Sequence, residues 1–365
     1  MAPLIKLLQR DGAFQVSTCV TGQHREMLDQ VLKIFDISPD YNLNIMGANQ
    51  TLNEIVARTI SALDEVLKKE LPDWVLVHGD TTTAMAASIT AFQNKVRIGH
   101  VEAGLRTYDM TQPWPEEINR RIVDTLSSML FAPTAKSKEN LLTENLGQKC
   151  IHVTGNTVID SLLWALEAIR SKPNMVNLVE SRLPTIPIGS RIILVTGHRR
   201  ENFGSGFEEV CRALRQISLR DDVSIVYPVH LNPNVKGPVT KLLGDIDNIF
   251  LVEPLDYLSF VWMLNRSFIV LTDSGGVQEE APSLGKPVLV MRDVTERPEA
   301  VSAGTVKLVG TKSDKIVNAV NELLDCSETY NSFCRSINPY GDGRAAARIV
   351  SALKEEAFSE FTYSS

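Results

Sequence analysis

The sequence of 365 residues shows no long apolar run of the kind found in membrane proteins, and no secretory leader is predicted from its opening residues. No run of about 18 or more apolar residues occurs, so no transmembrane helix is expected. The opening residues, MAPLIKLLQRDG, do not show the basic region, apolar stretch and cleavage site of a secretory signal. Only five cysteines are present, scattered without CxxC spacing, and their odd number argues against a disulfide framework. We therefore expect a protein of the reducing cytoplasm that does not associate with a membrane.

Clustered positive charge and metal-ligand spacings are absent as well. The formal net charge is −7 and no basic patch occurs, so nucleic acid is not an expected partner. An anionic ligand would have to be held by local dipoles and a few arginines. No two histidines have i, i+4 spacing and no Cys/His cluster occurs, so we expect neither a metal nor a cofactor.

What the chain does contain is a regular alternation of short β-branched runs and longer helical segments. Strands are predicted at Phe14–Val20, Trp74–Val77, Val96–Val101, Met129–Ala132, Cys150–Thr154, Arg191–Thr196, Val223–Pro228, Ile249–Val252, Phe268–Thr272 and Pro287–Met291. Helices are predicted at Ala2–Gln9, Thr82–Gln93, Glu116–Ser128, Val158–Arg170, Phe207–Ile217 and Asp314–Leu324. This alternation predicts an α/β fold with parallel sheets joined by βαβ crossovers.

The length exceeds that of one ordinary core and predicts two domains. The polar, proline-rich stretch Ile169–Ser190 has no strand of its own and indicates a boundary between two alternating halves. We expect two Rossmann-like domains facing each other across a cleft. The first should comprise residues 1–155 with 345–365, whose helix packs back on it, and the second residues 156–344.

Two carboxylates follow neighbouring strands of the first half. Asp80 comes after the strand at Trp74–Val77, and Glu102 comes after the strand at Val96–Val101. Ligands of open parallel sheets bind at the carboxyl ends of the strands, so these side chains are expected in one crevice. Two structural alternatives remain open, because Asp80 could cap the next helix and Glu102 could pair with Arg106.

The stretch WPEEINRR and the histidines give weaker signals. Glu116 and Glu117 suit the positive end of a helix dipole, and taken alone this structural interpretation is favoured. His198 precedes two arginines in a glycine-flanked loop after a strand, where packing explains little, so we expect a functional role. His230 also follows a strand and is the best of the remaining histidines, which are His24, His78, His100 and His152.

The segment LTDSGGVQEEAPSLG in the second half is typical of a strand-to-helix turn that holds an anion. Ser274, Gly275 and Gly276 lead into a helix whose free N–H groups and dipole favour a phosphate. Glu280 lies about one turn into that helix, where it can accept hydrogen bonds from ribose hydroxyls. A glycine pair alone is a weak signal, but with the preceding strand it predicts a cradle for a nucleoside diphosphate.

Several long motifs together resemble one enzyme family over essentially the whole chain. They are VHGDTTTAMAAS, GHVEAGLRT, PWPEEINRR, VTGNTVIDSL, VTGHRREN, YPVHLNPNV and LTDSGGVQEEAPSLGKPVLVMRDVTERPEAV. The chain resembles the bacterial non-hydrolysing UDP-N-acetylglucosamine 2-epimerases. That resemblance implies the GT-B fold, a cytoplasmic homodimer, and interconversion of UDP-GlcNAc and UDP-ManNAc for cell-surface polysaccharides.

The resemblance also implies a mechanism and its residues. The family eliminates UDP across C1–C2 to give a 2-acetamidoglucal and then adds UDP back with the proton on the other face. Asp80, Glu102 and Glu116 match its catalytic carboxylates, which revises the structural interpretation of Glu116, and His198 matches the histidine beside the diphosphate. Which carboxylate removes the proton stays open, and neither nicotinamide nor metal is required.

The nucleotide and regulatory contacts are implied in the same way. Ser274, Gly275 and Gly276 match the phosphate loop of the family, Glu280 its ribose contact, and Phe260 and Arg297 further nucleotide contacts. Some members bind a second UDP-GlcNAc as an activator. The corresponding residues in this sequence are Gln23, His24, Arg199 and His230.

One departure and several alternatives stand beside this interpretation. Family chains begin with a strand and the turn GTRPE-x-IK, whereas this sequence opens directly on the predicted helix Ala2–Gln9. Either a start codon assigned too late or a shortened product would explain this departure. For the sequence as given, we expect severely reduced activity and a less stable first domain with exposed apolar sheet. The alternative functions are a GT-B glycosyltransferase, a hydrolysing or modified-sugar 2-epimerase, and a nucleotide-sugar-binding protein without turnover.

Overall fold

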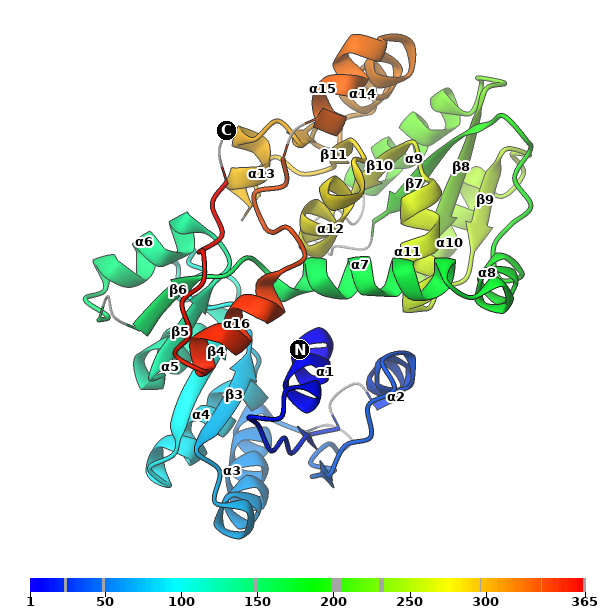
Figure 1. Cartoon of the computed structure of the whole chain (residues 1–365). Coiled ribbons are helices and arrows are strands. Elements are labelled where there is room, and N and C mark those ends of the chain that lie inside the picture. Colours follow the sequence, from blue (N-terminus) through cyan, green and yellow to red (C-terminus); the bar gives the residue numbers. More distant parts are fainter. Residues whose placement is uncertain are drawn as a thin grey trace. The chain divides into compact units, whose positions relative to one another are not determined.

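The structure, a computed structural model, describes residues 1–22, 25–47, 50–147, 150–197, 205–229, 233–295, 297–335 and 337–363. The chain divides into two compact units. Unit 1 comprises Met1–Ser161 with Tyr340–Thr362, and unit 2 comprises Leu162–Pro339 with Tyr363–Ser365. Each unit has its own parallel sheet with helices packed on it (Figure 1). The parallel α/β architecture predicted from the alternating pattern is confirmed.

The polar stretch Ile169–Ser190 is not the boundary between the units. It lies in unit 2 and contains helix α8 (Pro173–Glu180), while the units part inside α7 (Thr157–Arg170). Pro173 stands at the start of α8, where the missing N–H of proline costs no intrahelical bond. The proline-rich composition predicts a linker, but the first of its three prolines begins a helix instead.

Unit 1 holds a four-stranded parallel sheet in the order β3-β4-β5-β6 and a separate parallel pair, β1-β2. Its strands are β1 (Cys19–Val20), β2 (Tyr41–Asn42), β3 (Trp74–His78), β4 (Arg97–Val101), β5 (Met129–Ala132) and β6 (Ile151–Val153). Its helices are α1 (Ala2–Arg10), α2 (Arg25–Ile34), α3 (Leu52–Glu70), α4 (Thr82–Gln93), α5 (Glu116–Leu126), α6 (Ala135–Thr143) and α16 (Ala345–Leu353), with the first turn of α7. The predicted strand at Phe14–Val20 is therefore limited to its last two residues.

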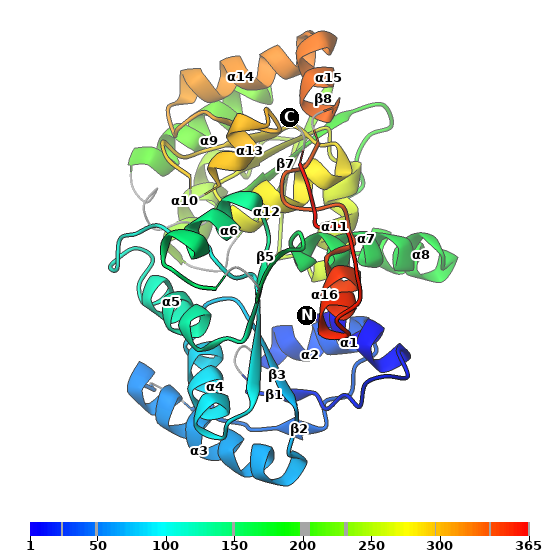
Figure 2. The same ribbon diagram turned by 60° about the vertical axis from the view of Figure 1, so that its left-hand side comes forward.

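Helices α3, α4 and α5 lie side by side along the sheet of unit 1 (Figure 2). Thr51 and Glu54 form a reciprocal capping box that begins α3, and the Thr81 side chain accepts from the amide of Ala84 to begin α4. Buried side chains of α3 and α4 meet the sheet through Leu63, Ala91 and Ile98 among others. This packing fixes the layer that carries the strand ends β3 and β4.

Helix α1 covers part of the sheet of unit 1 and lies beside α16 (Figures 1 and 2). Leu4 and Leu8 are buried against Val101 and Phe131 of the strands and Ile349 of α16. The expectation of exposed apolar sheet in this domain is wrong for this surface, because α1 and α16 together cover it.

Unit 2 holds a six-stranded parallel sheet in the order β12-β11-β10-β7-β8-β9. Its strands are β7 (Arg191–Thr196), β8 (Val223–Pro228), β9 (Ile249–Val252), β10 (Ile269–Thr272), β11 (Val288–Val290) and β12 (Val306–Leu308). Its helices are most of α7, then α8, α9 (Ser205–Ile217), α10 (Pro233–Leu243), α11 (Tyr257–Arg266), α12 (Gly275–Glu280), the 3₁₀ helix η3 (Ala281–Leu284), α13 (Pro298–Ser302), α14 (Ser313–Asp325) and α15 (Ser327–Arg335).

The two central strands of unit 2, β7 and β10, are neighbours. Ile193 pairs with Ile269, and Thr196 pairs with Thr272 at the carboxyl ends. The residues that follow these ends, Gly197 and Asp273, are therefore brought to the same edge of the sheet. Along the chain, the sheet grows from β7 through β8 to β9 on one side and then from β10 through β11 to β12 on the other. Open parallel sheets bind their ligands at such a reversal of strand order, which here lies between β7 and β10.

Candidate active site

Two adjacent strand ends of unit 1 bring Asp80 and Glu102 together, as predicted. Strands β3 and β4 are parallel neighbours, with His78 opposite Val101. Gly79 separates the end of β3 from Asp80 and has a left-handed φ of +68°. A Cβ atom at Gly79 would lie 3.2 Å from Oε2 of Glu102. Glycine therefore fits this position for two reasons: it adopts the left-handed backbone angle without strain, and it has no Cβ atom to contact the Glu102 carboxylate.

Asp80 is held by two residues of α5. Arg120 donates from Nη2 to Oδ2 of Asp80 at 2.6 Å, and Asn119 donates from Nδ2 to its carbonyl oxygen at 2.9 Å. The alternative that Asp80 caps the following helix is wrong, because the Thr81 side chain caps α4. Asp80 is thus free of a capping role and is oriented from another element.

The environment of Asp80 favours a carboxyl group that can carry a proton. Burial raises its pKa from the ordinary value of 3.8, the Arg120 guanidinium opposes that rise, and the negative charge of Glu102 adds to it. A carboxyl group with a raised pKa at a strand end is suited to proton transfer. The two carboxylates follow the ends of neighbouring parallel strands, which is why Glu102 contributes to this effect.

Glu102 is fixed by neighbours other than the one expected from the local sequence. Asn156 donates from Nδ2 to its Oε1 at 3.0 Å, and Nε2 of His78 lies 3.7 Å from its Oε2. Arg106 instead pairs with Asp124, so the predicted alternative of a Glu102–Arg106 pair is wrong. Glu102 also has a left-handed φ of +71°, an uncommon angle for a residue other than glycine and one that is frequent at functional sites.

His78 faces Glu102 as a neutral imidazole. Burial, with smaller contributions from the chain's amino terminus and from His100, lowers its pKa to about 3. The 3.7 Å contact between Nε2 of His78 and Oε2 of Glu102 is therefore not an ion pair, because the ring carries no positive charge.

The two glutamates at the start of α5 have different surroundings. Glu117 is fully buried, and its two oxygens accept from the amides of Thr107 and Tyr108, each at 3.1 Å. Glu116 is half-buried and lies three and four residues before Asn119 and Arg120, on the helix face that reaches Asp80. Glu117 is therefore structural, while the catalytic role of Glu116 stays a prediction supported by its position.

The predicted phosphate loop in unit 2 is a strand-to-helix turn. The Ser274 amide donates to Oγ1 of Thr272 at 2.9 Å, and α12 begins at Gly275. Gly275 is buried, whereas Gly276 is exposed, and a Cβ atom at Gly276 would meet nothing within 4 Å. The turn thus leaves open space at the helix start, which is compatible with the predicted anion.

Glu280 stands at the end of α12 in a buried position. It is 9% exposed, and burial together with the charge of Glu279 raises its pKa to about 8. The hydroxyl of Tyr257 is buried and has no hydrogen-bond partner in the described part of the chain. Burial, with the charge of Glu280, also raises the pKa of Tyr257. Such buried polar groups favour a ligand that can hydrogen-bond to them, as ribose hydroxyls can.

The other predicted nucleotide contacts have identified positions. Arg297 donates from Nε to Oε1 of Glu279 at 2.8 Å, so it is tied to the residue beside Glu280. Phe260 lies half-buried in α11, the helix that begins with Tyr257. Their roles as ligand contacts stay predictions.

Five predicted residues lie outside the residues that the structure describes. They are His198, which was expected beside the diphosphate, and Gln23, His24, Arg199 and His230 of the expected regulatory site.

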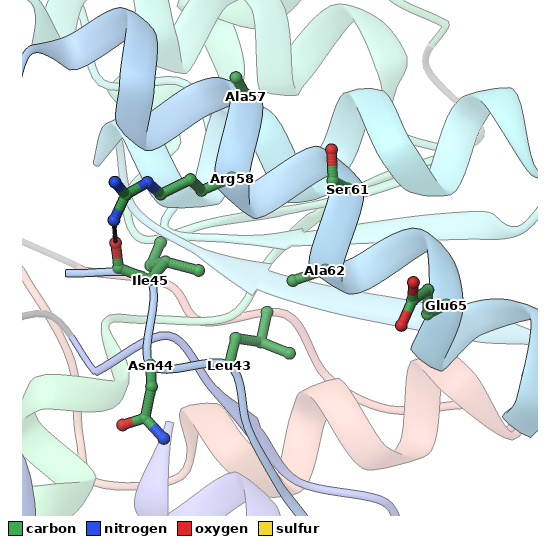
Figure 3. Close-up of a pocket in the computed structure, with 8 residues that line it drawn as sticks. All are labelled: Leu43, Asn44, Ile45, Ala57, Arg58, Ser61, Ala62 and Glu65. Atoms are coloured by element: carbon green, nitrogen blue, oxygen red, sulfur yellow. Dashed lines mark hydrogen bonds between the residues drawn. The ribbon is translucent and has the colours of Figure 1, made fainter.

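A hollow of about 500 Å³ in unit 1 is lined by none of the described residues predicted for the site (Figure 3). It is lined by Leu43, Asn44, Ile45, Ala57, Arg58, Ser61, Ala62 and Glu65. Arg58 donates to the carbonyl oxygen of Ile45 at 3.4 Å across it. Among the described residues, no group of three or more His, Cys, Asp and Glu side chains is arranged to hold a metal.

Sequence reasoning did not single out Asn119, Arg120 or Asn156 as parts of the site. Arg120 carries one available signal, because it lies four residues after Glu116 and therefore shares its helix face. Asn156 lies in the motif VTGNTVIDSL, but its contact with Glu102 spans 54 residues of sequence and has no local signature.

Comparisons with known proteins identify relatives of this chain. The chain matches the family model of UDP-N-acetylglucosamine 2-epimerase over residues 6–354. It is 54% identical over 360 residues to the UDP-N-acetylglucosamine 2-epimerase of Escherichia coli K12, covering 98% of this chain and 96% of that relative. The crystal structure of UDP-GlcNAc 2-epimerase from Neisseria meningitidis bound to UDP-GlcNAc superposes with a TM-score of 0.90 at 50% identity, covering 98% of this chain and 96% of the other.

A more distant structure is also similar. It is the UDP-GlcNAc 2-epimerase of Methanocaldococcus jannaschii in complex with UDP-GlcNAc and UDP, with a TM-score of 0.79 and 34% identity over 97% of this chain and 95% of the other. Because the match spans 96% of the Escherichia coli enzyme, this chain is near the length of its relatives. The expected reduction in activity stays a prediction.

Proposed function

This chain belongs to the UDP-N-acetylglucosamine 2-epimerase family, and we propose that it interconverts UDP-GlcNAc and UDP-ManNAc by inverting the configuration at C2 of the sugar. The observation that carries the proposal is the pair of carboxylates Asp80 and Glu102 at adjacent strand ends, one of them with a raised pKa. Inversion at C2 requires groups that take a proton from one face of the sugar and return one to the other.

The reaction proceeds by elimination and re-addition. A carboxylate takes the C2 proton, the electron pair of the C–H bond forms the C1=C2 double bond of a 2-acetamidoglucal, and UDP leaves with the electrons of the C1–O bond. In the return step, the UDP oxygen adds to C1 and C2 receives a proton on the opposite face. Elimination is needed because no carbonyl adjacent to C2 makes its hydrogen acidic.

The carboxylates divide this proton transfer between them. Asp80, with its raised pKa and its contact to Arg120, is suited to carry a proton during part of the cycle. Glu102 is oriented by the Asn156 amide, and Glu116 lies on the α5 face that reaches Asp80. Two negative charges close together repel each other, so one carboxyl group tends to keep its proton while the other is ionised. The ionised group can then act as the base.

Unit 2 binds the nucleotide. The amides and open glycine at Ser274–Gly276 hold the diphosphate, and Glu280 accepts from the ribose hydroxyls. Arg297 and Phe260 contact the remainder of the nucleotide, while His198 stabilises the departing phosphate. A second UDP-GlcNAc at Gln23, His24, Arg199 and His230 acts as an activator.

The proposal extends to the setting of the reaction. The enzyme works as a cytoplasmic homodimer without nucleic acid or membrane, and its product feeds cell-surface polysaccharide synthesis. Five free cysteines suit a reducing compartment. No helix among the described residues is both long enough and apolar enough to cross a bilayer. Sedimentation velocity of the purified chain should give the mass of two chains, and a single-chain mass at micromolar concentration would remove the dimer from the proposal.

The function is tested by incubating the purified chain with UDP-GlcNAc alone and separating the products. Formation of UDP-ManNAc without added acceptor supports the proposal. Release of free ManNAc and UDP would indicate a hydrolysing enzyme, and turnover only with an acceptor sugar would indicate a glycosyltransferase. Calorimetric binding of UDP without any conversion would indicate a binding protein.

A further inference from the structure

A line of buried polar groups lies behind Asp80 and Glu102 in unit 1. His100 in β4 places Nε2 at 3.0 Å from the carbonyl oxygen of Gly79 and Nδ1 at 2.6 Å from Oδ1 of Asp124. Asp124 in turn contacts Arg106, with 2.8 Å between Oδ2 and Nη2, and Arg106 contacts Glu144. The line therefore runs from the end of β3 through β4 and α5 to Glu144, the residue that follows α6.

This line is buried where it is closest to the strand ends. The side chains of His100, Asp124 and Arg106 are each 0% exposed. Charges in such positions are tolerated only when they are paired and hydrogen-bonded, and removing one partner is strongly destabilising to the others. Along the line, each of its side chains has a hydrogen-bond or ion-pair partner: His100 contacts Asp124, Asp124 contacts Arg106, and Arg106 contacts Glu144.

The line contacts the main chain beside both carboxylates. Gly79 immediately precedes Asp80, and its carbonyl can only accept, so Nε2 of His100 donates to it. The amide of Gly79 donates to Val101 at 3.0 Å, which ties the same residue to β4 from its other side. On the Glu102 side, the amide of Gly104 donates to Oδ2 of Asp124 at 3.3 Å.

Helix α5 couples the line directly to Asp80. Asp124 and Arg120 are four residues apart on one face of α5. Arg120 holds the Asp80 carboxylate while Asp124 holds the His100 ring, so a shift of α5 along its axis moves both contacts together.

We propose that His100 is a positioning residue of the reaction, which with Asp124 fixes the Gly79 carbonyl and thereby the separation of the Asp80 and Glu102 carboxylates. His100 itself touches no reacting atom in this role. The inference rests on the proposed function, because it concerns the two carboxylates that transfer the C2 proton. Displacement of a reacting group by about 1 Å can lower turnover by about 100-fold, so small changes at Gly79 have large effects.

Two variants of His100 separate positioning from general packing. The amide of His100→Gln reaches about as far as Nε2 and can still donate to Gly79, while the amide of His100→Asn reaches only as far as Nδ1. We expect His100→Asn to lose ~10-fold to ~100-fold in kcat with KM within about 3-fold, and His100→Gln to keep most of the activity. The kcat values are normalised to UDP-binding sites counted by calorimetry, which corrects for unfolded protein.

Hydrogen–deuterium exchange of the peptide that covers Gly79 supplies a second readout that does not need turnover. Exchange there should be faster in His100→Asn than in His100→Gln or the wild type. The matched control is His152→Asn, since His152 lies in β6 of the same sheet and packs on Phe131 and Phe358. We expect the control to keep wild-type kcat.

Equal normalised kcat values for the two His100 variants, or a change confined to KM, would overturn the proposal, as would unchanged exchange at Gly79 in His100→Asn. Failure of the proposed function has a different signature, which is a wild-type chain that does not convert UDP-GlcNAc. In that case the exchange experiment alone still decides whether His100 fixes Gly79.

Discussion

Arg120 reaches from α5 to Asp80 at the end of β3, with 2.6 Å between Nη2 and Oδ2 across 40 residues of sequence. The same guanidinium lies 3.3 Å from Oε2 of the buried Glu117. Arg120 therefore links the orientation of a predicted catalytic carboxylate to the helix that carries Glu116. It also opposes the rise in the pKa of Asp80 that burial causes.

Replacement of Arg120 by Gln should change the pH dependence of turnover. Without the guanidinium, burial and the charge of Glu102 act unopposed, so the pKa of Asp80 rises further. The acid limb of the kcat/KM profile should move upward by about 1 pH unit, and kcat at neutral pH should fall ~10-fold or more. The exposed Arg97→Gln at the start of β4 is the control, and an unshifted acid limb in the Arg120 variant would contradict the account.

Replacement of Glu102 by Gln should remove the proton transfer while leaving nucleotide binding intact. The amide keeps the size of the side chain and a partner for Asn156 but cannot accept a proton. We expect kcat to fall by ~100-fold to ~10,000-fold with the UDP dissociation constant within about 2-fold, measured by coupled assay and calorimetry. Glu139→Gln on the exposed face of α6 should behave as the wild type. Normal turnover by Glu102→Gln would exclude this residue from the chemistry.

Replacement of Glu280 by Gln should make the ligand-free protein more stable than the wild type, by a difference in unfolding free energy that grows as the pH rises. The unfolded chain releases this proton near 4.5, whereas burial and Glu279 hold the folded pKa at about 8. Between these values the wild type loses up to about 1.4 kcal/mol of stability per pH unit, and the amide does not. The difference in urea midpoint between variant and wild type should therefore grow from pH 5 to pH 8. The exposed Glu322→Gln should show no such growth, and a constant difference for Glu280→Gln would contradict the buried position.

Asp160 in α7 should contribute to the stability of unit 1 by capping α16. Its two oxygens accept from the amides of Ala345 and Ala346 at 3.2 and 2.8 Å, and its side chain is buried. Loss of both bonds in Asp160→Ala should cost about 1–3 kcal/mol in denaturant unfolding. Asp342→Ala, which breaks a more exposed pair with Arg348, should cost less than about 1 kcal/mol. Equal losses in the two variants would argue against the cap.

The strands of the sheet centres were predictable because buried parallel strands are continuous apolar runs. Arg191–Thr196 and Val223–Pro228 have such runs and form β7 and β8 at the predicted bounds. Tyr41–Asn42 carries no strand pattern, and its pairing with Cys19–Val20 depends on tertiary contacts that sequence does not display. The strand predicted from Phe14 is limited to Cys19–Val20, because its partner strand, Tyr41–Asn42, has only two residues.

Contacts in the site could be predicted from the sequence where the order of the strands brings residues together. They could not be predicted where the packing of helices brings residues together. Asp80 and Glu102 follow consecutive strands, which makes their proximity a consequence of topology. The pairing of Glu102 with Arg106 fails because Gly104, at φ +85°, turns the chain where a Cβ atom would lie 2.3 Å from the carbonyl of Ser137. That turn directs Arg106 to Asp124, a partner 18 residues away that local sequence does not indicate.

The most direct test of the two-carboxylate mechanism is a proton NMR time course of UDP-GlcNAc with the enzyme in deuterated water. The account predicts that UDP-ManNAc appears with deuterium at C2 and that the C2 proton signal of the recovered UDP-GlcNAc declines as equilibrium is approached. Deuterium should enter no other carbon of the sugar. Formation of UDP-ManNAc that retains the original C2 proton would contradict proton removal by Asp80 or Glu102.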